Sequence, residues 1–257
     1  MTDLRSRPLS RDTRAFGAWT SIGHSSITEI FAASTVDFIG IDLEHSTISL
    51  EQARQIIAAA HAGGTACFPR ISSHNGEQIK RLLGSGADGI IVPMVCTPEE
   101  VKRISEWCKY PPHGKRSYGV ASAQDYGFSF AEYTANWNKR SSIIIQIEAI
   151  SAVNCIDDLV SHEDVDGAMI GPYDLSGSLG IPGQITHPKV TEACQKVVEA
   201  CRKHGKACGT QIVDVNEKTV AAAFDSGFTF TILSSDVFLL WKWSESIRAL
   251  TAGLRGK

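Results

Sequence analysis

Short apolar runs rich in β-branched and aromatic residues alternate along the chain with longer stretches that have the spacing of amphipathic helices. The apolar runs predict eight buried strands, at residues 15–19, 36–42, 65–70, 89–93, 142–148, 167–171, 206–210 and 228–233. Clear helices are predicted between them at residues 50–62, 76–86 and 97–109. Thr97 and Glu100 form a capping box where the last of these begins. Eight strand–helix units in about 250 residues are typical of an α/β protein with the TIM (β/α)8 barrel fold.

A glycine-rich motif, GxGxxG at residues 84–89, raises the alternative of a doubly wound dinucleotide-binding fold. In that fold the motif follows a strand and opens a helix. Here it ends a predicted helix and precedes a strand, as a helix C-cap and turn would. The barrel is therefore the preferred fold, and no NAD site is expected.

Two connecting segments, residues 110–141 and 171–187, are longer than ordinary loops. Connections of that length in a compact domain are usually functional or disordered. No internal repeat or composition shift marks a domain boundary. We expect one barrel domain over residues 1–257, with residues 1–14 as a flexible or peripheral segment.

Composition narrows the possible partners. The chain has 25 Lys and Arg against 28 Asp and Glu, and a net charge of −3 argues against binding to nucleic acid or an anionic membrane. Seven cysteines without a CxxC motif are typical of a reducing compartment. No apolar run reaches membrane-spanning length, and no secretory signal is recognisable. We expect a cytoplasmic protein.

Two carboxylates stand at the ends of consecutive predicted strands. Glu148 ends the strand at 142–148, and Asp174 follows the strand at 167–171. Catalytic residues of α/β barrels gather at these carboxyl ends, and two carboxylates are the smallest protein contribution to a Mg²⁺-type site. The alternatives are an ion pair between Glu148 and an arginine, and a helix cap at Asp174. Strand alternation places Gln146 on the inward face with Glu148.

Further polar residues follow the second and third strands. Asp42, Glu44 and His45 lie in IDLEHS, where His45 is a candidate base because a neutral imidazole accepts protons near pH 7. Arg70 ends the third strand and should point inward, where a buried guanidinium needs an anion such as a substrate carboxylate or enolate. The alternative for Arg70 is a structural bridge to Glu44 or Glu148.

The segment PPHGKRSYG adds Lys115 and Arg116 on a turn shaped by proline and glycine. We predict that Arg116 recognises the distal end of an anionic substrate. A solvated charged loop is the alternative.

Several segments together resemble the HpcH/HpaI aldolase family of metal-dependent class II pyruvate aldolases: DFIGIDLEHS, PRIS, GADGIIVPMV, YPPHGKRS, QIE and VDGAMIGPYDLSGSLG. The resemblance implies a divalent metal on Glu148 and Asp174, with Mg²⁺ first and Mn²⁺, Co²⁺ or Zn²⁺ as alternatives. It implies Arg70 as the cation that stabilises an enolate and His45 as the acid/base group; Asp42, in the same IDLEHS segment, is a further candidate catalytic residue. It also implies pyruvate contacts from Gln146 and from the backbone at Tyr173 and Asp174.

The implied reaction is reversible cleavage of a 4-hydroxy-2-oxo acid to pyruvate, or a related 2-oxo acid, and an aldehyde. No predicted strand has an interior lysine, which argues against a Schiff-base route, and no PLP site is expected. A metal-dependent decarboxylase and a non-catalytic 2-oxo-acid-binding protein are the alternatives. The resemblance also implies a homohexamer that exchanges C-terminal helices, with which the apolar segment VFLLWKW (residues 237–243) is compatible.

The chain departs from the family at one position. Family aldolases carry an aspartate near the end of the third helix that partners the catalytic histidine, and Gly84 stands there in this chain. We expect a less basic His45 unless Asp42 or Asp88 takes over that role.

Overall fold

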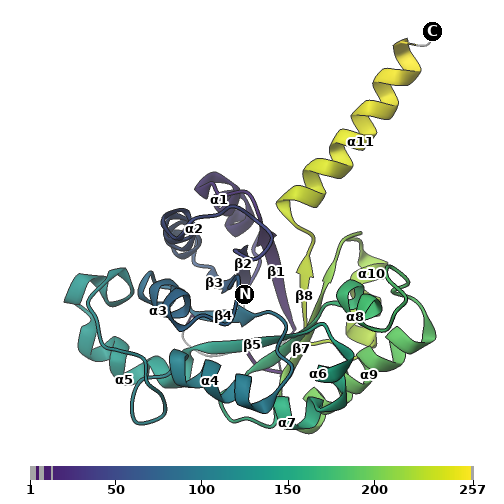
Figure 1. Cartoon of the computed structure of the whole chain (residues 1–257). Coiled ribbons are helices and arrows are strands. Elements are labelled where there is room, and N and C mark those ends of the chain that lie inside the picture. Colours follow the sequence, from purple (N-terminus) through teal and green to yellow (C-terminus); the bar gives the residue numbers. More distant parts are fainter. Residues whose placement is uncertain (1–3, 6–8, 13, 256–257) are drawn as a thin grey trace.

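The structure is a computed structural model that describes residues 4–5, 9–12 and 14–255. Eight parallel strands close into a barrel in the order of the sequence, which confirms the TIM-barrel prediction (Figure 1). The strands are β1 (Ala15–Thr20), β2 (Phe38–Asp42), β3 (Ala66–Arg70), β4 (Gly89–Val92), β5 (Ser142–Ile147), β6 (Gly167–Ile170), β7 (Ala207–Ile212) and β8 (Phe230–Leu233). Each predicted strand is present, with ends that differ by at most two residues.

Helices surround the barrel, and the capping box of Thr97 and Glu100 is formed at the start of α4. The helices are α1 (Ser25–Ala33), α2 (Leu50–Ala62), α3 (Gly76–Gly84), α4 (Pro98–Cys108), η1 (Ser122–Gly127), α5 (Phe130–Arg140), α6 (Ile150–Asn154), α7 (Ile156–Val160), α8 (Pro172–Ser178), α9 (Pro188–Lys203), α10 (Glu217–Asp225) and α11 (Asp236–Arg255). Among these helices of the described chain, none has the length and apolar character to cross a membrane.

The two segments expected to be long loops contain helices. η1 and α5 occupy much of residues 110–141, and α8 follows β6 directly. The glycine-rich motif at residues 84–89 lies where α3 ends and β4 begins, and Gly86 has a φ of +107°. This arrangement confirms that the motif is a helix end and a turn.

The barrel interior is filled by inward-facing aromatic side chains. Phe38 packs on Phe68 and Phe230, with ring centroids 5.3 Å and 6.0 Å apart. A Cβ at Gly40 would lie 2.3 Å from the indole of Trp19, so glycine is required there for Trp19 to enter the barrel. These rings form a packed core and leave the barrel open to chemistry only at its end.

The described residues of the N-terminal segment differ from the expected peripheral placement. Leu4 and Leu9 are 1% and 3% exposed, belong to the cluster that fills the barrel, and Leu9 N donates to Ser142 Oγ at the start of β5. The other residues of the predicted segment that bear on this expectation, 1–3, 6–8 and 13, lie outside the described residues.

Chain order decides at which end of the barrel each connection lies. Segments that follow strands lie at the carboxyl ends of the strands, and segments that follow helices lie at the opposite end. α11 differs from the other helices, because it follows β8 but extends away from the barrel (Figure 1). Its first residue, Asp236, is its only buried residue in the described structure.

Candidate active site

Arg70 is held at the end of β3 by two carboxylates. Asp42 is its neighbour in register on β2, and Arg70 Nη2 and Nε donate to Asp42 Oδ1 at 2.8 Å and 3.3 Å. Arg70 Nη1 lies 3.1 Å from Glu44 Oε2, so the predicted alternative of a bridge to Glu44 is present. Within the described chain, two of the five N–H groups of the guanidinium are hydrogen-bonded to Asp42, and Glu44 adds an ion pair, so N–H groups stay available for an anion.

Asp42 anchors the loop after β2. Its Oδ1 also accepts the main-chain N–H groups of Glu44 and His45 at 3.1 Å and 3.0 Å. Burial opposes ionisation, but Arg70 and the His45 N–H outweigh it and hold the pKa of Asp42 below its ordinary value. Asp42 therefore acts as a fixed anion that orients Arg70 and the loop, and it does not contact the His45 ring by any of these bonds.

His45 lies at the open edge of this site. Its side chain is 67% exposed, and Nε2 is 3.7 Å from Glu44 Oε2. Asp88 lies at the other end of the barrel, before β4, where it pairs with His61 at 2.8 Å. Gly84 ends α3 at that same far end, so within one chain neither position is placed to partner His45.

Glu148 follows β5 and is buried, with 4% of its surface exposed. Gln146 Nε2 donates to its Oε1 at 2.7 Å, and Met94 N donates to its Oε2 at 2.9 Å. Met94 holds a left-handed φ of +51°, which aims that N–H at the carboxylate. Burial raises the pKa of Glu148, and the charges of Glu44 and Asp174 raise it further against the Met94 N–H.

Asp174 lies in the first turn of α8, beside Glu148. The N-cap of that helix is Gly171, so Asp174 does not cap it. A Cβ built at Gly171 would lie 3.1 Å from Glu148 Oε1 and 3.5 Å from Asp174 Oδ2. The two carboxylates therefore converge on one small space that glycine leaves open.

This arrangement fits a divalent cation. Glu44, Glu148 and Asp174 interact as like charges, and Gln146 Oε1 is buried without a hydrogen-bond partner in the described structure. No three His, Cys, Asp or Glu side chains form a complete ligand set among the described residues. A pair of carboxylates completed by water and substrate oxygens is the usual protein share of a Mg²⁺ site. Glu148 and Asp174 would be the residues that hold it.

Tyr173 precedes Asp174 in the first turn of α8 and is 66% exposed. Its carbonyl oxygen accepts from Ser176 Oγ at 2.6 Å. N–H groups in a first helical turn have no partner within the helix, so this backbone suits the predicted contact with an anionic substrate.

Arg116 is not part of this site. It follows α4, and so lies at the opposite end of the barrel. Its guanidinium is 4% exposed, stacks 4.4 Å from the Trp137 ring and 4.6 Å from the Tyr110 ring, and Nη2 donates to the Tyr133 hydroxyl. Within the single chain Arg116 therefore does not lie beside the other predicted site residues, and its Nη1 is buried without a hydrogen-bond partner in the described structure.

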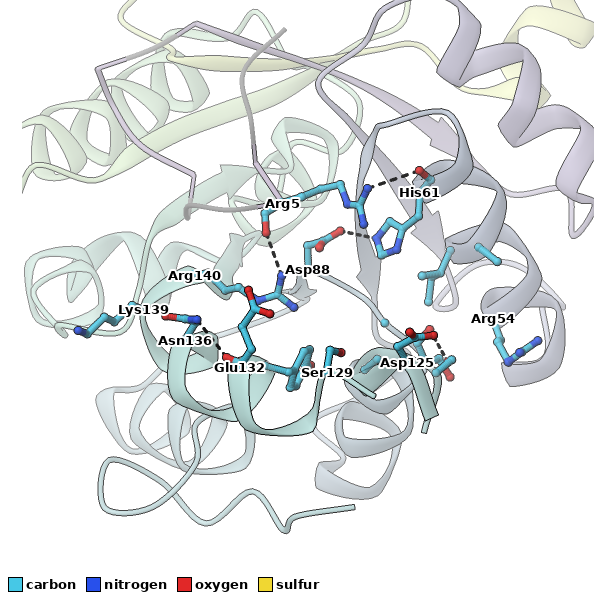
Figure 2. Close-up of a pocket in the computed structure, with 17 residues that line it drawn as sticks. Arg5, Arg54, His61, Asp88, Asp125, Ser129, Glu132, Asn136, Lys139 and Arg140 are labelled. Carbon is cyan, nitrogen blue, oxygen red and sulfur yellow. Dashed lines mark hydrogen bonds and ion pairs between the residues drawn. The ribbon is translucent and has the colours of Figure 1, made fainter. Parts of the chain in front are cut away.

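A separate cavity of about 890 Å³ is drawn in Figure 2. Its lining includes Arg54 and His61 of α2 and Lys139 and Arg140 of α5, with Asp88 bonded to His61. None of the predicted site residues lines it. The candidate site is therefore defined by the carboxyl ends of the strands and not by this cavity.

Two residues of the site went unpredicted. The Trp19 ring lies under the Arg70 guanidinium at 5.0 Å, and Met94 supplies the N–H to Glu148. The alternation of side chains along the first strand points Trp19 into the barrel near the end of that strand, and this pattern predicts a place for it in the site. The role of Met94 depends on its backbone conformation and left no signal in residue type.

A family model and sequences of known proteins match nearly the whole chain. The chain matches the family model described as HpcH/HpaI aldolase/citrate lyase over residues 15–242. It is 31% identical to a hydroxypyruvate/pyruvate aldolase of Roseobacter denitrificans over 95% of this chain and 94% of that one. It is 30% identical to a 5-keto-4-deoxy-D-glucarate aldolase of Citrobacter koseri, over 86% and 85% of the two chains.

A solved structure is similar over the same extent. The crystal structure of an HpcH/HpaI aldolase from Desulfitobacterium hafniense superposes with a TM-score of 0.87, at 28% identity and 93% coverage of each chain. The family model, the related sequences and the solved structure each match nearly the whole barrel. This chain belongs to the HpcH/HpaI aldolase/citrate lyase family.

Proposed function

We propose that the protein is a divalent-metal-dependent aldolase that reversibly cleaves 4-hydroxy-2-oxo acids to pyruvate, or a related 2-oxo acid, and an aldehyde. The observation that carries the proposal is the convergence of Glu148 and Asp174 beside Gly171, in the same charge network as Arg70. The names of the two aldolase relatives support the reaction class.

A divalent cation held by Glu148 and Asp174 would supply Lewis acidity at the 2-oxo group of a bound substrate. The chain's own contribution is to bind and orient the substrate beside it. Arg70, fixed by Asp42 and Glu44, directs its remaining N–H groups at the oxygen on which negative charge develops. Gln146 offers a buried carbonyl oxygen and holds Glu148 in place.

Cleavage breaks the C3–C4 bond of the substrate. The 4-hydroxyl proton passes to His45 through water, the C4–O bond becomes the aldehyde carbonyl, and the C3–C4 electron pair becomes the C2–C3 double bond of an enolate. Return of a proton to C3 then gives pyruvate. The exposure of His45 at the mouth suits a group that exchanges protons with solvent.

None of the eight strands in the described barrel contains a lysine, and the buried Lys109 lies at the end of α4, where it donates to Asn138 O and Ser141 O. A Schiff-base aldolase needs a desolvated lysine beside the substrate. The lysine positions therefore favour the metal-dependent route.

A screen of 4-hydroxy-2-oxo acids tests the proposal. The chelator-treated protein is assayed with Mg²⁺, Mn²⁺, Co²⁺ or Zn²⁺, and pyruvate is scored. We expect pyruvate release from at least one substrate only when metal is restored. Release of CO₂ from oxaloacetate without any aldol cleavage would instead identify a decarboxylase, and pyruvate binding without turnover under every metal would identify a binding protein.

We also propose that the chain forms a homo-oligomer, a hexamer as the family resemblance implies, through exchange of α11. Support comes from the exposed apolar side chains that α11 presents away from its own barrel, among them Trp241 at 51% and Trp243 at 63% exposed (Figure 1). Such a patch is costly to leave in water.

A further inference from the structure

The first residue of α11 is tied into the barrel, although the rest of that helix is not buried. Asp236 is 3% exposed, and its carboxylate accepts the Thr20 hydroxyl at 2.8 Å, Ser21 N at 3.0 Å and Ile22 N at 2.9 Å. Hydrogen bonds to an ionised carboxylate are about twice as strong as neutral ones. Asp236 thus fixes the end of β1 and the residues that follow it.

On the face of β1 that points into the barrel, the residues at this end contact Arg70 and its partner Asp42. Because side chains alternate along a strand, Trp19 and Ser21 face the barrel while Thr20 faces Asp236. The Arg70 guanidinium lies 5.0 Å over the Trp19 ring, and Ser21 Oγ lies 3.4 Å from Asp42 Oδ2. Trp19 also helps to lower the pKa of Asp42. Trp19, which contacts Arg70, and Ser21, which contacts Asp42, therefore stand on or beside the backbone that Asp236 holds.

We propose that Asp236 is a positioning residue for Arg70, acting through Ser21 and Trp19 on the Asp42–Arg70 pair. The proposal rests on the proposed function, since it assigns to Arg70 the developing negative charge of the reaction. It also couples the site to α11, because the residue that seats Arg70 is the residue that seats the helix.

The test compares Asp236→Asn, Ser21→Ala and the double variant for kcat and KM in the retro-aldol reaction. Asn keeps the size of the side chain but loses the charge that gathers three donors. We expect kcat to fall about tenfold in Asp236→Asn with KM within about twofold, because misplacing Arg70 costs stabilisation only in the transition state. Ser21→Ala should lower kcat as well, and the double variant should be no worse than the poorer single one.

Asp88→Asn is the matched control. Asp88 is equally buried at 3% and also accepts a main-chain N–H, from Cys67 at 3.0 Å, but at the far end of the barrel. It should lower Tm and leave kcat unchanged. A kcat of Asp236→Asn or of Ser21→Ala within about twofold of wild type, or effects that multiply in the double variant, would overturn the proposal.

A crystal structure of Asp236→Asn gives a readout that needs no activity. We expect the Arg70–Asp42 contact to lengthen or break while the barrel stays closed. If wild-type protein cleaves no substrate, the proposed function fails, and this structure still decides the positioning role. An Arg70 that keeps its 2.8 Å contact with Asp42 would overturn it.

Discussion

A side chain at position 171 would enter the space between Glu148 and Asp174. The added methyl group of Gly171→Ala would lie 3.0 Å from Glu148 Cγ and 3.1 Å from its Oε1, tighter than normal packing allows. We expect the carboxylates to be displaced and the affinity for divalent metal to fall about tenfold, as outer-shell changes at metal sites typically do. Calorimetric titration with Mn²⁺ measures the effect.

Gly177→Ala on the same short helix is its control, because a Cβ there meets nothing within 4 Å. Alanine is also the better helix former, so this variant should bind metal normally and be slightly more stable. Equal Mn²⁺ affinity in the Gly171 and Gly177 variants would contradict a metal site beside Gly171, and with it the assignment of Glu148 and Asp174 as metal ligands.

At the residue scale, the alternation of side chains along a strand predicts which of them face into the barrel. The charge of a loop residue does not tell at which end of the barrel that loop lies. Gln146 and Glu148 share a face of the strand predicted at residues 142–148, and the structure buries both side chains and bonds them to each other. The prediction for Arg116 rests on its charge and on the turn shaped by proline and glycine that carries it. Arg116 follows a helix, so its position in chain order already assigns it to the opposite end of the barrel. Its aromatic surroundings depend on tertiary packing that no local pattern specifies.

At the element scale, Asp166, the residue directly before β6, makes the free energy of unfolding depend on pH. Asp166 Oδ2 accepts Ile143 N at 2.8 Å, and burial raises the pKa of Asp166 to about 7, against the opposing charges of Lys109 and Lys206. The folded state then binds a proton that the unfolded state has released. Stability from this group is present at low pH and is lost as pH rises from about 4 to about 7.

We therefore expect the free energy of unfolding to fall over that pH range by up to about 4 kcal/mol from Asp166. Asp166→Asn should remove this slope, since an amide accepts the same N–H without titrating. Urea unfolding at a series of pH values measures it. Parallel pH profiles for the two proteins would show that Asp166 stays ionised in the folded state.

The elements themselves were largely predictable. Buried parallel strands are nearly continuous apolar runs, so all eight appear in the sequence. α5 was missed because its sequence, FAEYTANWNKR, is mostly polar and buries only Tyr133 and Trp137. The cap alternative at Asp174 implies a short helix after it, and the structure has such a helix, α8, but begins it at Pro172 with Gly171 as the N-cap.

At the scale of the whole molecule, the exposed face of α11 is the feature that a single chain leaves without a partner in the described structure (Figure 1). Trp241→Glu with Trp243→Glu should shift the proposed hexamer to smaller species, because burial of each indole in the proposed interface would be lost. Size-exclusion chromatography with light scattering measures the mass.

Ser246→Glu adds a charge to the same exposed helix without removing an apolar side chain, and it should leave the mass unchanged. A wild-type mass of one chain, or an unchanged mass in the double tryptophan variant, would contradict the exchange of α11.

We propose that a 2-oxo acid enolate forms beside Glu148, Asp174 and Arg70. Exchange of pyruvate's methyl protons with D₂O, followed by proton NMR, reports enolate formation without any knowledge of the aldehyde. Chelator-treated wild-type protein should exchange only after a divalent metal is restored, and Glu148→Gln should exchange at least about a hundredfold more slowly. Exchange that needs no metal, or that proceeds at the wild-type rate in Glu148→Gln, would contradict the account.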